Sequence, residues 1–454
     1  MKLAKVIALF KKGSKSEPNN YRPISLLSCF NKIFEKLICK QLYSFLVTYK
    51  ILIKYQFGFR PLHSTNFALT EITDTIKSYI DSQNFVLGLF VDLSKAFDTV
   101  DHEILLYKLA HYGIRGHANK FFRSYLSDRK QYTIVNGVNS ATRSINCGVP
   151  QGSVLGPVLF LIYINDVCNA VGGNITRLFA DDAGLFTHGR NINTLIQDSI
   201  TIYKRLFKWC SYNRLTVNFS KTCFVIFHSV RNKPPENLNE IKIDDITISR
   251  VKDIRYLGLQ LDEHLSWKEH VTELCKSLTK CFGILKKLHD SITRPIARQL
   301  YFAFIFSRIN FGIEIYGSCA GYISSKVQTL SGKLLKYLLK LDPMTSTVQL
   351  NNTYKNLKIL KIEDLIKVNT LVFVKKCLYK ECPELFYDYY EYRNHEHFSR
   401  DRKLRIPRSR TIFGSKSLKI KGASLWNSFD KEIKQKAKLQ CFKKHLTIFY
   451  TSKY

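Results

Sequence analysis

The chain has 454 residues, of which 45% are hydrophobic, and its 70 Lys and Arg residues outnumber its 36 Asp and Glu residues. The apolar content excludes a disordered protein, and the length predicts two to four structural units. The formal net charge of +34 predicts nucleic acid as a partner, and a membrane surface is the weaker candidate because the basic residues are spread along the chain.

The first 100 residues contain three predicted elements. The segment up to residue 60 is basic and turn-rich at its start. A helix is then expected from Asn31, with one apolar face formed by Ile33, Phe34, Leu37, Ile38 and Leu42. A second helix is expected over residues 66–80, and the apolar run 85–91, which ends on Asp92, is typical of a buried strand.

The middle of the chain alternates between helix and strand patterns. Helices are expected between Asp101 and Gly113, from Pro157 to about Val167, and over residues 193–210. Hairpins are expected at Asn136-Gly137, around residues 178–186 and over 241–248, with further strands at 215–217 and 224–227. Beyond residue 267 the pattern is mostly helical. This order predicts a sheet domain over about 85–260, placed between helical ones.

The cysteines and the apolar runs restrict the cellular environment. Twelve cysteines are scattered without a CxxC pair, which predicts reduced thiols in an intracellular protein, with a zinc site assembled from distant residues as the alternative. The most apolar run, residues 154–164, contains Gly156 and Pro157 and is shorter than the roughly 20 residues of a membrane span. No membrane partner is therefore expected.

Two stretches of the C-terminal part allow two interpretations each. The basic stretch 400–410 could bind RNA or act as a nuclear signal, and a solvated loop is an equal alternative. The aromatic run 386–392 could stack on bases, but its acidic residues favour packing inside the protein.

Three aspartates suggest metal-dependent chemistry. Asp181 and Asp182 are adjacent between two short apolar runs, and adjacent carboxylates repel each other unless a cation lies beside them. Asp92 ends an apolar strand, so two strands would supply three acids. Such a cluster can hold two Mg²⁺ ions for phosphoryl transfer. A solvated turn is the alternative for the Asp-Asp pair taken alone.

Residues 148–157 contain three glycines and two prolines, which impose an unusual backbone path. Glycine allows the backbone to approach a ligand closely, and Gln151 can hydrogen-bond to a base or a sugar. The composition alone is also that of an ordinary loop, so the order of the residues carries the information.

The motifs together resemble those of reverse transcriptases of non-LTR retrotransposons, of jockey or LINE type. Residues 179–182 resemble the (F/Y)xDD box, residues 92–98 the first palm motif DxSKAFD, and residues 148–157 the motif GxPQGxxLGP. The segments 11–13, 20–26 and 56–61, with Ser64-Thr65, resemble the fingers motifs. The order matches that of the family over about residues 1–260, and the tail, including residues 422–427, resembles the C-terminal extension of the same elements.

The resemblance implies an α+β right-hand polymerase with a ferredoxin-like palm, helical fingers and thumb, and a mostly helical C-terminal extension. Fingers are expected over 1–80, the palm over 81–260, the thumb over 261–340 and the basic extension over 341–454. The family usually carries an endonuclease upstream of this region, so a truncated copy or a partial gene model is expected. The implied function is RNA-directed DNA synthesis, and an inactive relic that only binds nucleic acid is the alternative.

The resemblance also assigns roles to single residues. It implies that Asp92, Asp181, Asp182 and the carbonyl of Leu93 hold two Mg²⁺ ions, with Mn²⁺ as a substitute. Lys221 would protonate the leaving pyrophosphate, although a surface lysine is the alternative. Phe97 would exclude a 2′-hydroxyl, which disfavours an RNA-dependent RNA polymerase. The remaining implied contacts are Arg60 with the triphosphate, Gln151 and Gly152 with nucleotide and template, and Tyr256, Leu257 and Gly258 with the primer.

The implied partners are an RNA template, a DNA primer and deoxynucleoside triphosphates. The expected location is the nucleus, the cytoplasm or both, as a ribonucleoprotein. The oligomeric state stays open.

Overall fold

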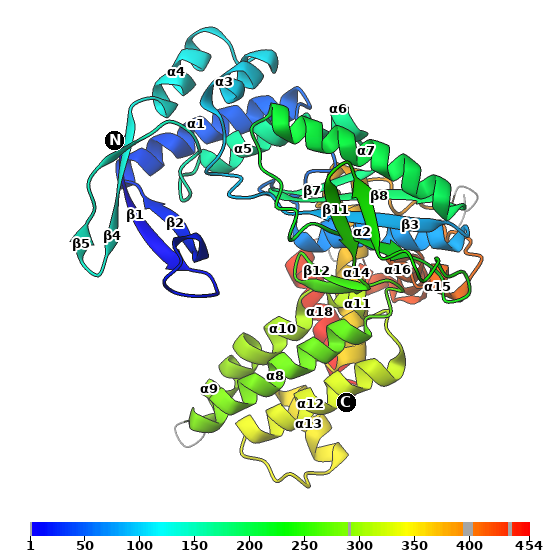
Figure 1. The fold of residues 1–454 in the computed structure, drawn as a ribbon. Coiled ribbons are helices and arrows are strands. Elements are labelled where there is room, and N and C mark those ends of the chain that lie inside the picture. The colour runs from blue at the N-terminus through cyan, green and yellow to red at the C-terminus, as the bar shows by residue number, and fades with distance from the viewer. Residues whose placement is uncertain (1, 289–291, 394–402, 435–437) are drawn as a thin grey trace.

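A computed structural model describes residues 2–288, 292–393, 403–434 and 438–454 (Figure 1). It confirms a mixed α/β fold in which a central sheet lies between an N-terminal part and a helical second half. Residues 400–402 of the basic stretch 400–410 lie outside the described residues. Within the described ranges, no helix combines the length and the apolar character that a membrane crossing needs.

The central sheet has six strands in the order β10-β11-β9-β3-β8-β7. The four that bear on the site are β3 (Phe85–Val91), β7 (Thr176–Phe179), β8 (Asp182–Gly189) and β9 (Cys223–Phe227), and the outer pair is β10 (Glu240–Ile243) and β11 (Ile246–Arg250). The helix α5 (Gly156–Ile164) lies in the chain between β3 and β7, and α7 (Ile192–Tyr212) lies between β8 and β9. This βαββαβ unit confirms the ferredoxin-like sheet expected from the resemblance.

Both faces of the sheet are covered, because alternate residues of a strand point to opposite sides. Leu87 and Leu89 of β3 belong to the core that α5 and α7 complete. Val86 and Phe90 belong to a second core, which is formed with α2 (Thr65–Asp81) and with the hairpin of β12 (Asp253–Tyr256) and β13 (Leu259–Asp262). All seven residues of β3 are buried, as the apolar run predicts.

The N-terminal part contains more strand than the sequence pattern predicts. A smaller sheet pairs β1 (Leu3–Phe10) with β2 (Tyr21–Leu26) and with β4 (Arg129–Val135), and β4 also pairs with β5 (Val138–Asn139) and β6 (Arg143–Ile145). The helices α3 (His102–His111), α4 (Gly116–Leu126) and α6 (Val167–Val171) and the turn η1 (Pro18–Asn20) complete this half. β4, the second partner of β1, lies more than 120 residues away along the chain, so local patterns give no sign of that pairing.

The helix α1 (Cys29–Thr48) exists as predicted, but most of its expected apolar face is not in the core. Ile33, Phe34 and Leu37 are more than half exposed, whereas Glu35 is buried. The Glu35 carboxylate accepts hydrogen bonds from three other groups: Asn31 Nδ2 at 2.8 Å, Tyr125 Oη at 2.7 Å and the Val154 backbone N–H at 2.6 Å. The helix is therefore turned so that this polar anchor, and not the apolar stripe, faces the loop before α5.

The second half is helical, as predicted beyond residue 267. Its first part consists of α8 (Lys268–Leu288), α9 (Arg294–Leu300), the π-helical turn η3 (Tyr301–Phe306), α10 (Ser307–Asn310), α11 (Ile313–Tyr316), α12 (Gly321–Leu338) and α13 (Thr347–Leu357). The C-terminal part consists of α14 (Ile362–Leu378), the turn η4 (Glu384–Phe386), α15 (Ile412–Ser415), α16 (Leu418–Ser428), α17 (Lys431–Lys434) and α18 (Leu439–Thr451). In the aromatic run, Phe386, Tyr389 and Tyr390 pack against Phe373, which confirms the packing interpretation.

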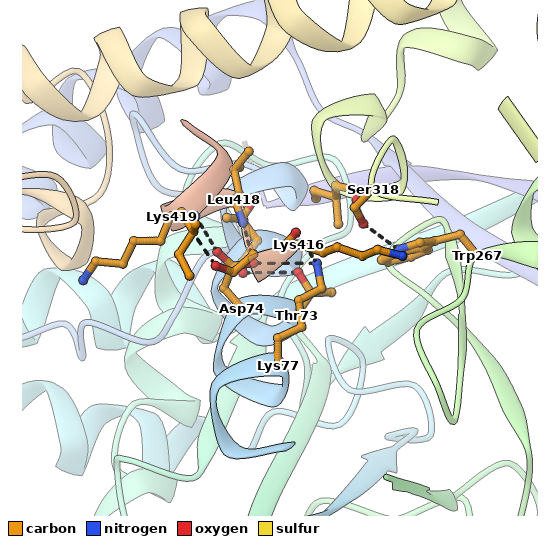
Figure 2. Close-up of polar contacts among 12 residues, drawn as sticks. Thr73, Asp74, Lys77, Trp267, Ser318, Lys416, Leu418 and Lys419 are labelled. Carbon is orange, nitrogen blue, oxygen red and sulfur yellow. Dashed lines mark hydrogen bonds and ion pairs between the residues drawn. The ribbon is translucent and has the colours of Figure 1, made fainter. Parts of the chain in front are cut away.

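The C-terminal part is joined to α2 by polar contacts as well as by a shared apolar core. Asp74 of α2 accepts hydrogen bonds from the backbone N–H groups of Leu418 at 3.0 Å and Lys419 at 2.9 Å, at the start of α16 (Figure 2). The buried ammonium group of Lys77 lies 3.9 Å from Asp74 and donates to the carbonyl of Lys416 at 3.2 Å. All twelve cysteines are free thiols, in agreement with the prediction.

Candidate active site

Two pairs of adjacent strands bring the three aspartates to one edge of the central sheet. In the antiparallel pair of β3 and β8, Val91 lies opposite Ala183, so Asp92 leaves β3 where Asp182 begins β8. β7 and β8 are joined through Ala180 and Asp181, and Ala180 has a positive φ of 56°. This tight turn places Asp181 next to Asp182 at the same edge.

The three carboxyl groups influence one another electrostatically. Partial burial and the negative charges of Asp181 and Asp92 raise the pKa of Asp182 from 3.8 to about 6. Burial is also the main cause of the raised pKa of Asp181, and the charge of Asp92 adds to it. Like charges at this spacing favour a bound cation, and carboxylate oxygens are the donors that Mg²⁺ prefers. The donor set therefore fits divalent ions.

The spacing of the aspartates is looser than that of a closed metal site. Among the described residues, the group of three or more His, Cys, Asp or Glu side chains whose ligand atoms all lie within 4.8 Å is His228, Glu263 and His264. The three aspartates are thus brought to one edge, but their oxygens are not all within this distance of one another. A shared pair of ions stays a prediction.

The segment that carries Lys221 is attached to the backbone around Asp92. The Ser94 N–H donates to the Thr216 carbonyl, and the Asn218 N–H donates to the Asp92 carbonyl, both at 2.8 Å. The Lys221 ammonium group lies 3.3 Å from the Asp92 carboxylate. Lys221 thus lies beside Asp92, but it is also exposed and in the turn that enters β9, so its role in the reaction stays a prediction.

The predicted strand 215–217 is reduced to a single bridge between Leu93 and Val217. The strand prediction is wrong because the chain turns again after Val217, with the N–H groups of Lys221 and Thr222 bonded to the Asn218 carbonyl. The bridge places Leu93 directly beside the site, with its side chain buried.

The ring of Phe97 is held in place by other aromatic rings. It stacks on Phe160 at a centroid distance of 4.3 Å and meets the edge of Phe59 at 6.0 Å. The stack fixes the ring next to the loop that leads from Asp92, since the Phe97 carbonyl also accepts from the Val149 N–H. A ring held in this way is suited to a steric role.

Gln151 and Gly152 lie against the strand β2 of the smaller sheet. The side-chain amide of Gln151 donates to both carboxylate oxygens of Asp98, at 2.9 and 3.0 Å. The backbone carbonyl of Gln151 accepts from the Ser25 N–H at 2.7 Å. Gly152 has a φ of 111°, and a Cβ there would lie 2.7 Å from the Ser25 carbonyl oxygen. Asp98, which sequence reasoning quoted without a role, is therefore a positioning partner of Gln151.

The loop of residues 56–60 supports the turn that carries Asp181. The Gln56 side-chain oxygen accepts from the backbone N–H groups of Ala180 at 2.9 Å and Gly58 at 2.8 Å, and a Cβ on Gly58 would lie 2.3 Å from the Ala180 nitrogen. The sequence patterns indicate neither role, although Gln56 and Gly58 both belong to a segment that resembles a fingers motif. The Arg60 guanidinium donates to the carbonyls of Ile53 and Gln56. In this conformation it is engaged by its own loop.

Two basic residues of the smaller sheet act on the aspartates and were also missed. Lys11, directly after β1, and Arg22, in β2, both lower the pKa of Asp181 by their charge, and Lys11 does the same for Asp182. In the sequence, the sign of such a role is that both residues belong to segments that resemble the fingers motifs. They supply positive charge where an anion would approach the acids.

The hairpin of β12 and β13 lies against the strands that carry the aspartates. Leu257 and Gly258 form its turn with φ values of 46° and 93°, the pattern of a tight two-residue hairpin. The buried ring of Tyr256 contacts Phe90 at 4.9 Å. Burial, and after it the charge of Asp182, raises the pKa of Tyr256, so this hydroxyl lies near the acids.

The chain matches a known protein family over more than half of its length. The family described as reverse transcriptase (RNA-dependent DNA polymerase) matches residues 10–261. The "Probable RNA-directed DNA polymerase from transposon BS" of Drosophila melanogaster is 29% identical over 352 residues, which cover 74% of this chain and 38% of the relative. The "RNA-directed DNA polymerase from mobile element jockey" of Drosophila funebris is 27% identical over 378 residues, which cover 80% and 40%.

A solved structure of apo telomerase from Candida tropicalis matches with a TM-score of 0.41 and 11% identity, over 80% of this chain and 62% of that one. The chain spans about two fifths of the length of the curated relatives it matches.

Proposed function

Since the chain belongs to the reverse transcriptase (RNA-dependent DNA polymerase) family, we propose that it extends a DNA primer on an RNA template, using deoxynucleoside triphosphates. The observation that carries the proposal is the meeting of Asp92, Asp181 and Asp182 at one edge of the βαββαβ sheet, inside the matched region. These are the acids that nucleotidyl transfer requires.

Reverse transcriptases generally use divalent metal ions, and Mg²⁺ is the proposed ion here, with Mn²⁺ as a substitute. Asp92, Asp181 and Asp182 would hold two such ions, and the carbonyl of Leu93 would add a ligand. When bound, the ions neutralise the negative charge that develops on the phosphoryl oxygens.

The other residues at the site bind and orient the substrates. Lys11 and Arg22 attract the triphosphate. Arg60 joins them once its side chain leaves the carbonyls of its own loop. Lys221, held 3.3 Å from Asp92, is placed to give its proton to the leaving pyrophosphate. Phe97 covers the sugar position and excludes a 2′-hydroxyl.

Template and primer contacts come from opposite sides of the site. Gln151, held by Asp98, and Gly152 contact the nucleotide and the template strand. The hairpin with Tyr256, Leu257 and Gly258 contacts the primer end. It belongs to the core that the sheet forms with α2. The net charge of +34 adds a binding contribution that falls as salt rises.

The proposed division into parts follows the same scheme. Fingers span residues 1–80, the palm 81–260, the thumb 261–340 and the C-terminal extension 341–454. Support comes from the position of the whole six-stranded sheet within the second range, whereas the β12–β13 hairpin crosses the proposed boundary at residue 260. We expect the protein to act as a ribonucleoprotein in the nucleus, the cytoplasm or both.

The test is primer extension on an RNA template with purified protein, deoxynucleoside triphosphates and Mg²⁺ or Mn²⁺. Asp92→Asn and Asp182→Asn should reduce incorporation to background, whereas Asp198→Asn, at an exposed position of α7, should leave it unchanged. RNA binding without incorporation by well-folded wild-type protein, or full activity of Asp182→Asn, would contradict the proposal.

A further inference from the structure

We propose that His228, Glu263 and His264 form a Zn²⁺ site that is separate from the three aspartates. His228 directly follows β9, and Glu263 and His264 directly follow β13. One ligand atom of each side chain lies within 4.8 Å of the other two. The proposal does not depend on polymerase activity.

The distances suit a tetrahedral ion after small side-chain adjustments. His228 Nε2 lies 3.6 Å from Glu263 Oε2, and His264 Nε2 lies 3.9 Å from Glu263 Oε1. Zinc bonds of 2.0–2.1 Å place neighbouring ligand atoms about 3.3 Å apart in a tetrahedron. Two imidazoles and one carboxylate leave a fourth position for water, and nitrogen ligands favour zinc over magnesium.

Hydrogen bonds orient both imidazole rings for metal binding. His228 Nδ1 lies 2.8 Å from the Ser229 carbonyl, and His264 Nδ1 lies 3.1 Å from the His228 carbonyl. A carbonyl can only accept, so each Nδ1 carries the proton and each Nε2 is left as the free nitrogen that faces Glu263. This pattern, a backbone carbonyl behind each ring, is the usual support of metal-bound histidines.

Without a cation, this arrangement is unfavourable for His228. Its Nε2 faces a carboxylate, which is favourable only if Nε2 is protonated or if a cation lies between the two groups. The ring is 4% exposed, so the surrounding protein leaves this nitrogen little access to water. A bound cation resolves the conflict, since it uses the neutral nitrogen and the charged oxygen at once.

The surrounding groups hold the ligands in position. Arg250 donates to Glu263 Oε2 at 3.1 Å, which orients the carboxylate. The backbone N–H of His228 donates to the Glu263 carbonyl at 3.1 Å, so the two chain segments are already joined. Asp262 accepts from the backbone N–H groups of His264 and Trp267. A zinc ion here would fasten β9 to the segment that enters α8.

The experiment uses the full chain, stripped of metal with a chelator and then titrated with Zn²⁺ and, separately, with Co²⁺ as a spectroscopic probe. We expect one tightly bound Zn²⁺ per chain and a rise in Tm on zinc addition. Glu263→Gln and His264→Gln should abolish both, while His117→Gln, at an exposed position of α4, should keep both. The Co²⁺ complex should show visible d–d bands without a thiolate charge-transfer band.

Equal zinc binding by wild type and His264→Gln, or a thiolate band that places the ion on cysteines, would overturn the proposal. His228→Gln alters a buried ring, so its folding is checked by circular dichroism. Glu263 and His264, whose side chains are 17% and 31% exposed, carry the test if that variant does not fold. Because every readout is metal binding or Tm, failure of the zinc site is distinguishable from failure of the polymerase proposal.

Discussion

Replacing Asp74 with alanine should weaken the attachment of the C-terminal part to α2. The carboxylate receives the backbone N–H groups of Leu418 and Lys419 and the hydroxyl of Tyr389, and its side chain is 9% exposed (Figure 2). The variant leaves these donors without an acceptor at the start of α16. It also leaves the ammonium group of Lys77, which is 3% exposed, without its counter-charge.

The expected loss of stability follows from the hydrogen bonds and the ion pair that the variant removes. Hydrogen bonds to a charged group contribute about 1.5–3 kcal/mol each, and removal of one partner of a buried ion pair costs about 3–5 kcal/mol. The losses overlap because they share one carboxylate, so we expect the free energy of unfolding to fall by about 3–5 kcal/mol. Asp74→Asn keeps one acceptor oxygen and should lose less.

The pH dependence separates the charge effect from the hydrogen bonds. Burial lowers the pKa of Lys77 from 10.5 to about 8, against the opposing charge of Asp74, and this shift corresponds to about 3 kcal/mol. The unfolded chain holds the proton up to about pH 10.5, so the stability contributed by this group rises with pH above 8. Without Asp74 the pKa of Lys77 falls further and the rise starts at lower pH.

The assay is urea unfolding of both proteins in reducing buffer at pH 6 and pH 9, with Asp245→Ala, at an exposed position, as the control. The difference between wild type and Asp74→Ala should be largest at pH 6 and should narrow as the pH rises through 8. A difference below about 1 kcal/mol at pH 6, or one that grows with pH, would refute the reasoning.

Two further predictions concern the proposed active site, and a third concerns the polar anchor of α1. Phe97→Val should raise ribonucleotide over deoxyribonucleotide incorporation about tenfold or more in primer extension, and an unchanged ratio would contradict the gate. Gly58→Ala forces a Cβ against the Ala180 nitrogen, and the displacement of the turn that carries Asp181 costs about 1–3 kcal/mol. The variant should have a lower kcat and unchanged RNA binding. A wild-type kcat would show that the turn tolerates the displacement. Glu35→Ala removes a buried acceptor and should lower stability by about 3 kcal/mol in urea unfolding, with partial recovery in Glu35→Gln; equal stability of all three would rule out the anchor.

Much of the central sheet could be predicted from the sequence, because its strands and helices carry strong local patterns. The buried run 85–91, the helix capped by Asp101 and the hairpin around Asp181 and Asp182 all form as expected. The predicted N-cap of α3 is real, with the Asp101 side chain accepting from the Ile104 N–H at 2.9 Å. Such features depend on residues a few positions apart, and that is the range over which a sequence pattern can be followed.

The supporting contacts of the site could not be predicted in the same way. Gln56 bonds to Ala180 across 124 positions, and Gln151 bonds to Asp98 across 53. The motifs contained these residues, but a motif does not state which side chain meets which backbone group. Lys11 and Arg22 act on Asp181 only because β3 pairs with β8 and because the smaller sheet lies close to that edge.

By itself, the sequence determined the type and order of the central elements, the acids that end two of them and the family whose motifs they match. The tertiary structure decided that α1 turns most of its expected apolar face outward, that the C-terminal part packs on α2, and that His228 meets Glu263 and His264. The physical reason is that periodicity shows which side of an element is apolar, whereas burial and hydrogen bonding depend on what the rest of the chain places against it.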